Sequence, residues 1–225
     1  MNLAPLIEYF AGERGQTPSH AALGDRRFLA ALLTVREPDP IPEEVAARLD
    51  ALLSEEAAAR GFVEAEDVPT LAAQGIAFGA AAERMRLWRG DLTVLCADAI
   101  VNAANDKMLG CFTPGYHLPA SYVIHTVGPI VPSHAPTAGD EAALASCYRS
   151  ILDVADAHGD VRTVGFCAIS TGVFGYPKDA GARVAIRSIR DWLTEHPDSR
   201  VEPLISAFTA ADETIYLDAI REVLA

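Results

Sequence analysis

Two separated stretches decide the fold of this chain: Leu87–Asn105, LWRGDLTVLCADAIVNAAN, and Ile169–Pro177, ISTGVFGYP. The first stretch contains a polar turn, an apolar strand and then two asparagines just beyond that strand. The second is the end of an apolar strand that opens into a Ser-Thr-Gly-Val-Phe-Gly loop before a helix. Both stretches therefore place polar groups at the carboxyl end of a buried strand, which is where ligands bind in open α/β sheets.

Short apolar runs alternate with helical periods from Met85 onward. Continuous apolar runs are typical of strands covered on both faces, and they occur at Ala99–Ala103, Tyr122–Val127, Val161–Ile169 and Leu204–Thr209. Apolar residues at helical spacing occur in Leu144–Ala155, Ala182–Leu193 and Asp212–Leu224. This alternation predicts an α/β sandwich with a mixed, largely parallel central sheet.

The first 84 residues predict a helical N-terminal extension and a linker. Pro42 stands where a helix begins, two glutamates follow it, and Gly61 provides a C-terminal stop. An earlier helix is expected near Arg26–Val35. Residues 69–84 are rich in Ala and Gly and are interpreted as the connection to a main domain over residues 85–225.

The composition excludes several classes of protein. Half of the 225 residues are hydrophobic and 22% are charged, which allows a sizeable core. The net charge of −13 argues against binding to duplex nucleic acid, which needs a basic surface. No apolar run reaches the length of a membrane span, and the N-terminus has no signal-peptide pattern. We expect a cytoplasmic monomer with neither a nucleic-acid nor a membrane partner.

The cysteines and histidines mostly have structural interpretations. Cys96, Cys147 and Cys167 lie in apolar patterns, where cysteine behaves as a small hydrophobic residue. A disulfide framework is not expected in a chain of this size with so few cysteines. We interpret His125 as a hydrogen-bonded core histidine and His117 as a surface residue.

The first candidate ligand residues follow the early strands. Asp91 comes after a glycine in a tight turn, where its carboxylate is either a turn cap or an acceptor for an adenine amino group. Asn102 and Asn105 flank two alanines at the end of a buried strand. An amide side chain offers the donor and the acceptor that ribose hydroxyls need, although an asparagine can also serve only to tie down a loop.

The later strands end in two further candidates. In the loop Ser170–Gly175, two glycines permit close backbone approach and a helix begins just beyond, so the loop suits a diphosphate held by backbone N–H groups. Phe208 ends the last strand, where it either stacks on a purine or packs in the core. Four signals on four strand ends together predict a nucleotide-like ligand.

The motifs GDLT, AIVNAAN, YVIHTVGP and AISTGVFGYP resemble those of the macrodomain family, in the same order. The helical run before them and the segment MLGCF resemble the zinc-containing microbial subclass of that family. The resemblance implies a three-layer α/β/α fold that binds ADP-ribose. It also implies a zinc-dependent ADP-ribosylhydrolase that removes ADP-ribose from mono-ADP-ribosylated protein.

The resemblance assigns a role to each matching residue. It implies that Asp91 and Leu92 bind adenine and that Asn102 and Asn105 bind the distal ribose, where the reaction takes place. Cys111 matches a cysteine that binds Zn²⁺ in the subclass. The implied contacts to phosphate and purine come from Ser170, Thr171, Gly172, Val173, Phe174, Gly175 and Phe208.

The chain departs from the family pattern between Cys111 and Gly115, where several tens of residues have no counterpart. Either a segment is left out of the sequence or it is truly deleted. We favour the first, because two parallel neighbouring strands need a crossover of a dozen or more residues. If the short connection is real, a reader that binds ADP-ribose without turnover gains weight. Deacylation of O-acyl-ADP-ribose in the same pocket is a third hypothesis.

Overall fold

The computed structural model describes residues 2–37, 39–104 and 112–224, and the chain divides into two compact units, Met1–Gly61 and Phe62–Ala225. The N-terminal unit contains helices α1 (Ala4–Gly12), α2 (Arg26–Thr34) and α3 (Glu43–Arg60) and a short 3-10 turn, η1 (Ala22–Gly24). Its core is made by apolar side chains from all three helices: Leu6, Ile7, Phe10, Ala11, Leu29, Leu32 and Leu52.

Local sequence signals explain where these helices begin and end. The Asp25 carboxylate caps α2 by accepting hydrogen bonds from the N–H groups of Arg27 and Phe28. Pro42 precedes the first turn of α3. Gly61 follows the last turn of α3 with a φ of 72°, a backbone conformation that side chains with a Cβ rarely adopt.

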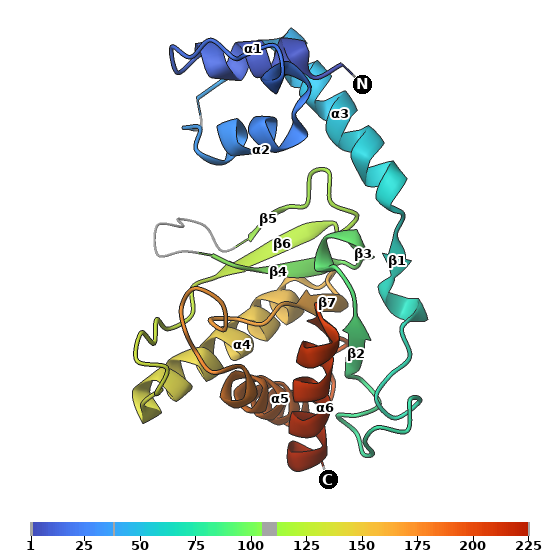
Figure 1. Ribbon diagram of the computed structural model, residues 1–225. Coiled ribbons are helices and arrows are strands. Elements are labelled where there is room, and N and C mark those ends of the chain that lie inside the picture. Colours follow the sequence, from blue (N-terminus) through green and yellow to red (C-terminus); the bar gives the residue numbers. More distant parts are fainter. Residues whose placement is uncertain (1, 38, 105–111, 225) are drawn as a thin grey trace. The chain divides into compact units, whose positions relative to one another are not determined.

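The second unit is built on a mostly parallel six-stranded sheet with the order β2-β8-β7-β4-β6-β5 (Figure 1). Its strands are β2 (Arg86–Arg89), β4 (Ala99–Ala103), β5 (Phe112–Pro114), β6 (Tyr122–Thr126), β7 (Thr163–Phe166) and β8 (Glu202–Ala207). All neighbouring pairs are parallel except β5 and β6. The predicted fold, a central mostly parallel sheet flanked by helices, is confirmed.

Three helices connect or follow the strands: α4 (Ala138–His158), α5 (Lys178–Glu195) and α6 (Ala210–Val223). They lie together on one side of the sheet (Figure 1), where their buried residues join those of the strands in one large hydrophobic cluster. Side chains alternate between the two faces of each strand. In β4, Ala99 and Val101 therefore belong to this cluster, whereas Ile100 points to the opposite face.

The opposite face carries a smaller hydrophobic cluster. Ile100, Val123 and Leu204 of the sheet meet Ala65 of the 3-10 turn η2 (Ala65–Asp67) and Leu95 there. Leu95 belongs to β3 (Leu95–Cys96), which pairs in parallel with the short β1 (Val63–Glu64). A further 3-10 turn, η3 (Leu92–Val94), leads from β2 toward β3.

Residues 62–84, assigned by sequence to the N-terminal extension, belong to the second unit. Leu71, Ala77 and Ala82 are buried in its large cluster. The Arg84 guanidinium donates hydrogen bonds to the carbonyls of His196, Ser199 and Val201, which lie between α5 and β8. The Ala- and Gly-rich composition therefore encodes a segment that packs closely on the sheet domain.

Between β4 and β6 the structure describes one short edge strand, β5, and residues 105–111 lie outside the described part of the chain. β5 pairs antiparallel with β6 at the edge of the sheet, with Thr113 opposite Val123. Because β5 runs back along β6, it returns the chain to the end of the sheet at which β6 begins. The stretch from Gly115 to Ser121 then turns the chain into β6, with the Gly115 N–H donating to the Ser121 carbonyl at 2.8 Å.

Among the described residues, none of the helices has the length and apolar character needed to cross a membrane.

Candidate ligand cleft

Four predicted ligand residues line one cleft at the carboxyl end of the sheet. Asp91 and Leu92 come from the end of β2, Thr171 from the loop after β7, and Phe208 from the end of β8. The cleft has a volume of about 200 Å³ and opens to solvent, so it is smaller than a typical small-molecule site. Its remaining lining residues are Cys167, Ala168, Lys178, Ser206, Asp212 and Tyr216.

Asp91 caps the turn that follows β2. One carboxylate oxygen, Oδ1, accepts hydrogen bonds from the Thr93 N–H at 2.9 Å and from the Thr93 hydroxyl at 2.8 Å. No described residue donates a hydrogen bond to the other oxygen, Oδ2, and Asp91 is exposed. The turn-cap and ligand interpretations of this residue are therefore compatible, because one oxygen serves each role.

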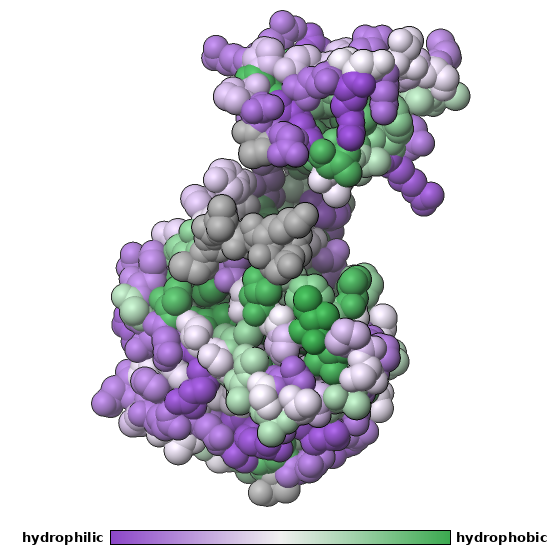
Figure 2. Space-filling view, turned by 90° about the vertical axis from the view of Figure 1, so that its left-hand side faces the viewer, coloured by the Kyte–Doolittle hydropathy of each residue, from purple (hydrophilic) through white to green (hydrophobic). Residues whose placement is uncertain are grey.

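Phe208 does not pack in the core, which corrects the core-packing alternative raised for it in the sequence. Its side chain is 72% exposed at the rim of the cleft. Exposing a phenyl ring to water is unfavourable, so a ring in this place is available to cover a ligand. Val127, Ile130 and Val173 are also exposed. Figure 2 shows apolar surface gathered on one face of the second unit.

The predicted phosphate loop, Ser170–Gly175, is held by its own hydrogen bonds and by the segment after β6. The Gly175 N–H donates to the Gly172 carbonyl at 3.0 Å, and the Val131 N–H donates to the Phe174 carbonyl at 2.6 Å. Gly175 has a φ of 75°, and a Cβ there would meet the Val131 carbonyl oxygen at 2.6 Å. This position therefore requires glycine for two separate reasons.

The loop presents unpaired backbone donors. Within the described part of the chain, nothing accepts a hydrogen bond from the N–H groups of Thr171, Gly172, Val173 or Phe174. Val173 is fully exposed and Gly172 has open space around it, so water or a ligand can reach this backbone. Consecutive free N–H groups in a loop favour an anion such as a phosphate.

Ser170 is the buried member of this loop. Its φ is 63°, the residue is 6% exposed, and its hydroxyl has no hydrogen-bond partner among the described residues. Gly128 makes room for it, since a Cβ on Gly128 would lie 2.1 Å from the Ser170 hydroxyl oxygen. A strained backbone and an unpaired buried hydroxyl at one residue are features that cluster at ligand sites.

Asn102 lies at the carboxyl end of β4, opposite His125 in the β4–β6 ladder. Its amide nitrogen contacts His125 Nδ1 at 3.1 Å, and His125 Nε2 contacts the Thr113 hydroxyl of β5 at 2.9 Å. His125 is hydrogen-bonded, as the sequence predicts, but half-buried. The two remaining predicted residues, Asn105 and Cys111, lie outside the described residues.

The cleft wall also contains an ion pair that no pattern in the sequence indicated. Lys178, the first residue of α5, lies 2.6 Å from the Asp212 carboxylate of α6. The Lys178 ammonium, then the Thr209 hydroxyl, hold the pKa of Asp212 below its ordinary value. Thr209 and Asp212 form a capping box at the start of α6, a spacing that could have been recognised from the sequence.

Two neutral ionisable groups, Tyr216 and Cys167, also line the cleft. Burial raises the pKa values of Tyr216 and Cys167, and a nearby tyrosine, Tyr148, is raised in the same way. These groups stay protonated at neutral pH because the interior penalises their charged forms. The charge of the cleft therefore comes from Asp91 and from the paired Lys178 and Asp212.

Among the described residues, no three His, Cys, Asp or Glu side chains gather in a way that could hold a metal ion. Cys96, Cys147 and Cys167 are free thiols. Cys111, the one residue that the sequence predicts to bind a metal, lies outside the described part of the chain.

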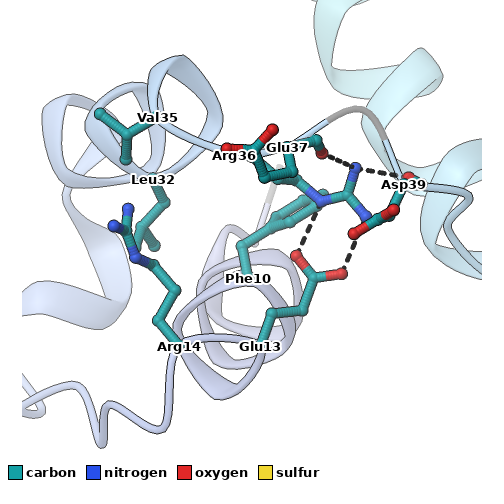
Figure 3. A pocket seen from close by; sticks show the side chains of 8 residues that line it. All are labelled: Phe10, Glu13, Arg14, Leu32, Val35, Arg36, Glu37 and Asp39. Carbon is teal, nitrogen blue, oxygen red and sulfur yellow. Dashed lines mark hydrogen bonds and ion pairs between the residues drawn. The ribbon is translucent and has the colours of Figure 1, made fainter.

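A second hollow lies within the N-terminal unit (Figure 3). Arg36 donates two hydrogen bonds there to the Glu13 carboxylate, at 2.7 and 2.9 Å, and one each to the carbonyls of Glu37 and Asp39. The same guanidinium lies 5.7 Å from the centre of the Phe10 ring. This arrangement joins α1 to the segment after α2 and serves the structure of the unit.

Comparison with known families and proteins points to one group. A family model described as "Macro domain" matches residues 110–185. The mouse protein "ADP-ribose glycohydrolase MACROD1" is 42% identical over 169 residues, which cover 61% of this chain and 52% of the mouse protein. The chain therefore spans about half the length of that relative.

Two further relatives align over more of their length. The "Protein-ADP-ribose hydrolase" of Staphylococcus aureus (strain Mu50 / ATCC 700699) is 31% identical over 231 positions, covering 84% of this chain and 82% of that protein. A crystal structure of a Trypanosoma brucei macrodomain in complex with ADP-ribose superposes with a TM-score of 0.62 at 27% identity. That match covers 81% of this chain and 92% of the trypanosomal one.

Proposed function

Because this chain belongs to the macro domain family, we propose that it is an ADP-ribosylhydrolase, which binds ADP-ribose and removes it from mono-ADP-ribosylated protein. The observation that carries the proposal is the cleft itself. It is lined by the exposed phenyl ring of Phe208 and by Asp91, to whose second carboxylate oxygen no described residue donates. The loop that enters it at Thr171 carries N–H groups, from Thr171 to Phe174, that pair with nothing in the described part of the chain.

Each feature suits one part of ADP-ribose. The free Asp91 oxygen accepts a hydrogen bond from the adenine amino group, and Phe208 covers the purine face. The free N–H groups of the loop hold the diphosphate, which needs no lysine or arginine. A chain with a net charge of −13 can therefore bind a dianionic ligand.

The bond to be cleaved lies at the distal ribose. We assign the binding of that ribose to Asn102 at the end of β4 and to Asn105. Hydrolysis breaks the bond between the ribose and the modified side chain, with water supplying the hydroxyl to the sugar and a proton to the protein side chain. The carboxamides orient the sugar hydroxyls for this step, because an amide offers both a donor and an acceptor.

We also propose that Zn²⁺ is a cofactor and that Cys111 is one of its ligands. Catalytic zinc in proteins usually has three protein ligands, and the described residues do not gather such a set. Any further ligands would therefore have to come from outside that part of the chain. For this reason we assign to zinc no step of the reaction.

Release of ADP-ribose tests the proposal. An auto-modified ADP-ribosylated protein is incubated with this chain, and free ADP-ribose is measured over time. We expect release, and we expect a chelator to abolish it if zinc is required. Metal analysis of the same sample reports zinc content independently of activity. A metal-replete sample that releases no ADP-ribose would contradict the hydrolase assignment.

A reader module is the second candidate. The observation that favours it is the combination of a formed ligand cleft with no metal-binding cluster among the described residues. Such a protein binds ADP-ribose without cleaving it. Calorimetry that detects ADP-ribose binding, in a sample whose hydrolase assay is blank, would decide for this function.

A further inference from the structure

His125 links Asn102 to the edge of the sheet. The residue stands opposite Asn102 in the β4–β6 ladder, and both side chains are on the face of the sheet away from α4, α5 and α6. Its two ring nitrogens contact Asn102 Nδ2 at 3.1 Å and Thr113 Oγ1 at 2.9 Å. Three neighbouring strands, β4, β6 and β5, thus each contribute one side chain to a single row.

The orientation of the Asn102 amide gives the row a direction. An amide nitrogen only donates, so Asn102 Nδ2 donates and His125 Nδ1 accepts. A neutral imidazole then carries its proton on Nε2, which donates to the Thr113 hydroxyl oxygen. With the Asn102 amide in this orientation, His125 carries its proton on Nε2 and every contact in the row is satisfied.

The same contact fixes the orientation of the Asn102 amide. Because Nδ2 is turned toward His125, Oδ1 is turned the other way, and no described residue donates a hydrogen bond to it. Asn102 is exposed at the end of β4, so this oxygen is available to a ligand hydroxyl. If the amide were reversed, Oδ1 would face His125 and the ring would need its proton on Nδ1, and a donor would replace the acceptor at the ligand side.

We propose that His125 is a positioning residue, which holds the Asn102 carboxamide with its oxygen toward the ribose of the ligand. The inference rests on the proposed function, because it takes Asn102 to be a ribose-binding residue. His125 does not need to touch the ligand. It acts through the accepting lone pair of Nδ1, and Thr113 acts in turn by keeping the proton on Nε2.

The test compares three substitutions of His125 by calorimetric titration with ADP-ribose. In His125→Asn, the amide oxygen takes the place of Nδ1, so binding should stay within about twofold of wild type. In His125→Gln, the amide reaches the place of Nε2 and leaves Asn102 without its acceptor. Binding by His125→Gln and by His125→Phe should each weaken about tenfold, the value of one lost hydrogen bond.

The expected ranking of affinities, with His125→Asn above His125→Gln and His125→Phe, distinguishes a positioning role from a packing role. Phe and Gln replace more of the imidazole volume than Asn does, so a residue that only fills space would tolerate them better. His196→Phe is the matched control: that ring stacks on Trp192 with centroids 4.2 Å apart, and its loss should leave ADP-ribose affinity unchanged. Thermal unfolding of each variant reports whether the fold is retained.

A double-mutant cycle tests the coupling directly. If His125 acts through Asn102, then His125→Phe in the background of Asn102→Ala should weaken binding by less than about twofold further. The ¹⁵N signals of the His125 ring in the wild type should show an unprotonated Nδ1 and a protonated Nε2.

The outcomes separate the two levels of the argument. Wild-type protein that fails to bind ADP-ribose would overturn the proposed function and this inference with it. Wild-type protein that binds, with additive losses in the cycle or with His125→Asn as weak as His125→Phe, would overturn the positioning role alone.

Discussion

Asp91 and Phe208 line the same cleft from the ends of two paired strands. β2 and β8 run parallel with Arg89 opposite Ala207, and the Gly90 N–H donates to the Ala207 carbonyl at 3.0 Å. The Ser206 hydroxyl donates to the Gly90 carbonyl at 2.9 Å. These bonds hold the carboxylate and the phenyl ring on one rigid frame, which favours recognition of a flat base between them.

Replacing Phe208 by Ala should weaken ADP-ribose binding about tenfold, because the ring supplies stacking area on the purine. Stability should change little, since the side chain is 72% exposed. Calorimetry and thermal unfolding measure the two effects. Phe78, which is 80% exposed and does not line the cleft, is the matched control, and its substitution by Ala should not alter affinity. Equal affinity in the two variants would remove Phe208 from the site.

Replacing Asp91 by Asn should reduce the selectivity for adenine. The wild type is expected to prefer ADP-ribose over inosine diphosphate ribose, which lacks the exocyclic amino group, by about tenfold. Asn can keep the contact of Oδ1 with Thr93 but replaces the free acceptor with a donor. The ratio of the two dissociation constants is the measurement. An unchanged ratio in Asp91→Asn would show that this carboxylate does not read the base.

Gly175→Ala should destabilise the phosphate loop by about 2 kcal/mol, because it forces a Cβ into a left-handed backbone and against the Val131 carbonyl. Gly172→Ala in the same loop should be nearly neutral for stability, because a Cβ there would meet nothing within 4 Å. Denaturant unfolding of both variants is the check. A Gly172→Ala variant as unstable as Gly175→Ala would mean that the loop tolerates no side chain at either position.

Glu202 should make stability depend on acid pH. Burial acts to raise its pKa, but hydrogen bonds from Arg86 and Arg162 outweigh burial and hold the pKa below its ordinary value of 4.5. A lowered pKa in the folded state contributes stability that is fully present above 4.5 and is lost as the pH falls through the folded value. The free energy of unfolding should therefore fall on the acid side of this window.

Glu202→Gln is expected to cost about 2 kcal/mol at neutral pH, because Arg86 keeps only 11% of its side chain exposed and would lose its carboxylate partner. The free energy of unfolding of this variant, measured with urea between about pH 3 and 7, where carboxylates titrate, should fall less steeply with decreasing pH than that of the wild type. Glu195→Gln removes a carboxylate from an exposed pair with Arg149 and should have little effect. If the free energies of unfolding of wild type and Glu202→Gln depended equally on pH, the ionised Glu202 carboxylate would not be the stabilising group.

Much of the sheet was predictable because the sequence of a buried parallel strand is a continuous apolar run. Ala99–Ala103 is a strand with the bounds that the sequence indicates, and Thr163–Phe166 lies inside the predicted run Val161–Ile169. The edge strand β5 was not predicted. It has three residues, one of them a proline, and its pairing depends on β6 more than on any periodicity of its own.

The candidate site was predictable where a residue type follows a strand end, and not where a contact depends on the fold. Asp91 and Phe208 were predicted from their places after apolar runs, and the structure brings both to one cleft. The Lys178–Asp212 pair joins the first turns of two helices far apart in sequence, so no local pattern reports it. The link between Asn102 and His125 depends on the register of β4 against β6, which only the sheet establishes.

The pairing of β2 with β8 also sets an order for biosynthesis. β2 is made early in the second unit, yet among the described strands of the sheet it pairs with β8, through residues 204–207. Until the ribosome has released that segment, β2 has its bridge to Thr70 but not its ladder with β8, and Phe208 is absent from the cleft. Such long-range pairing slows folding, because the chain must close a large loop before contacts repay its entropy. A nascent chain can therefore acquire the phosphate loop before it acquires the base-binding half of the cleft.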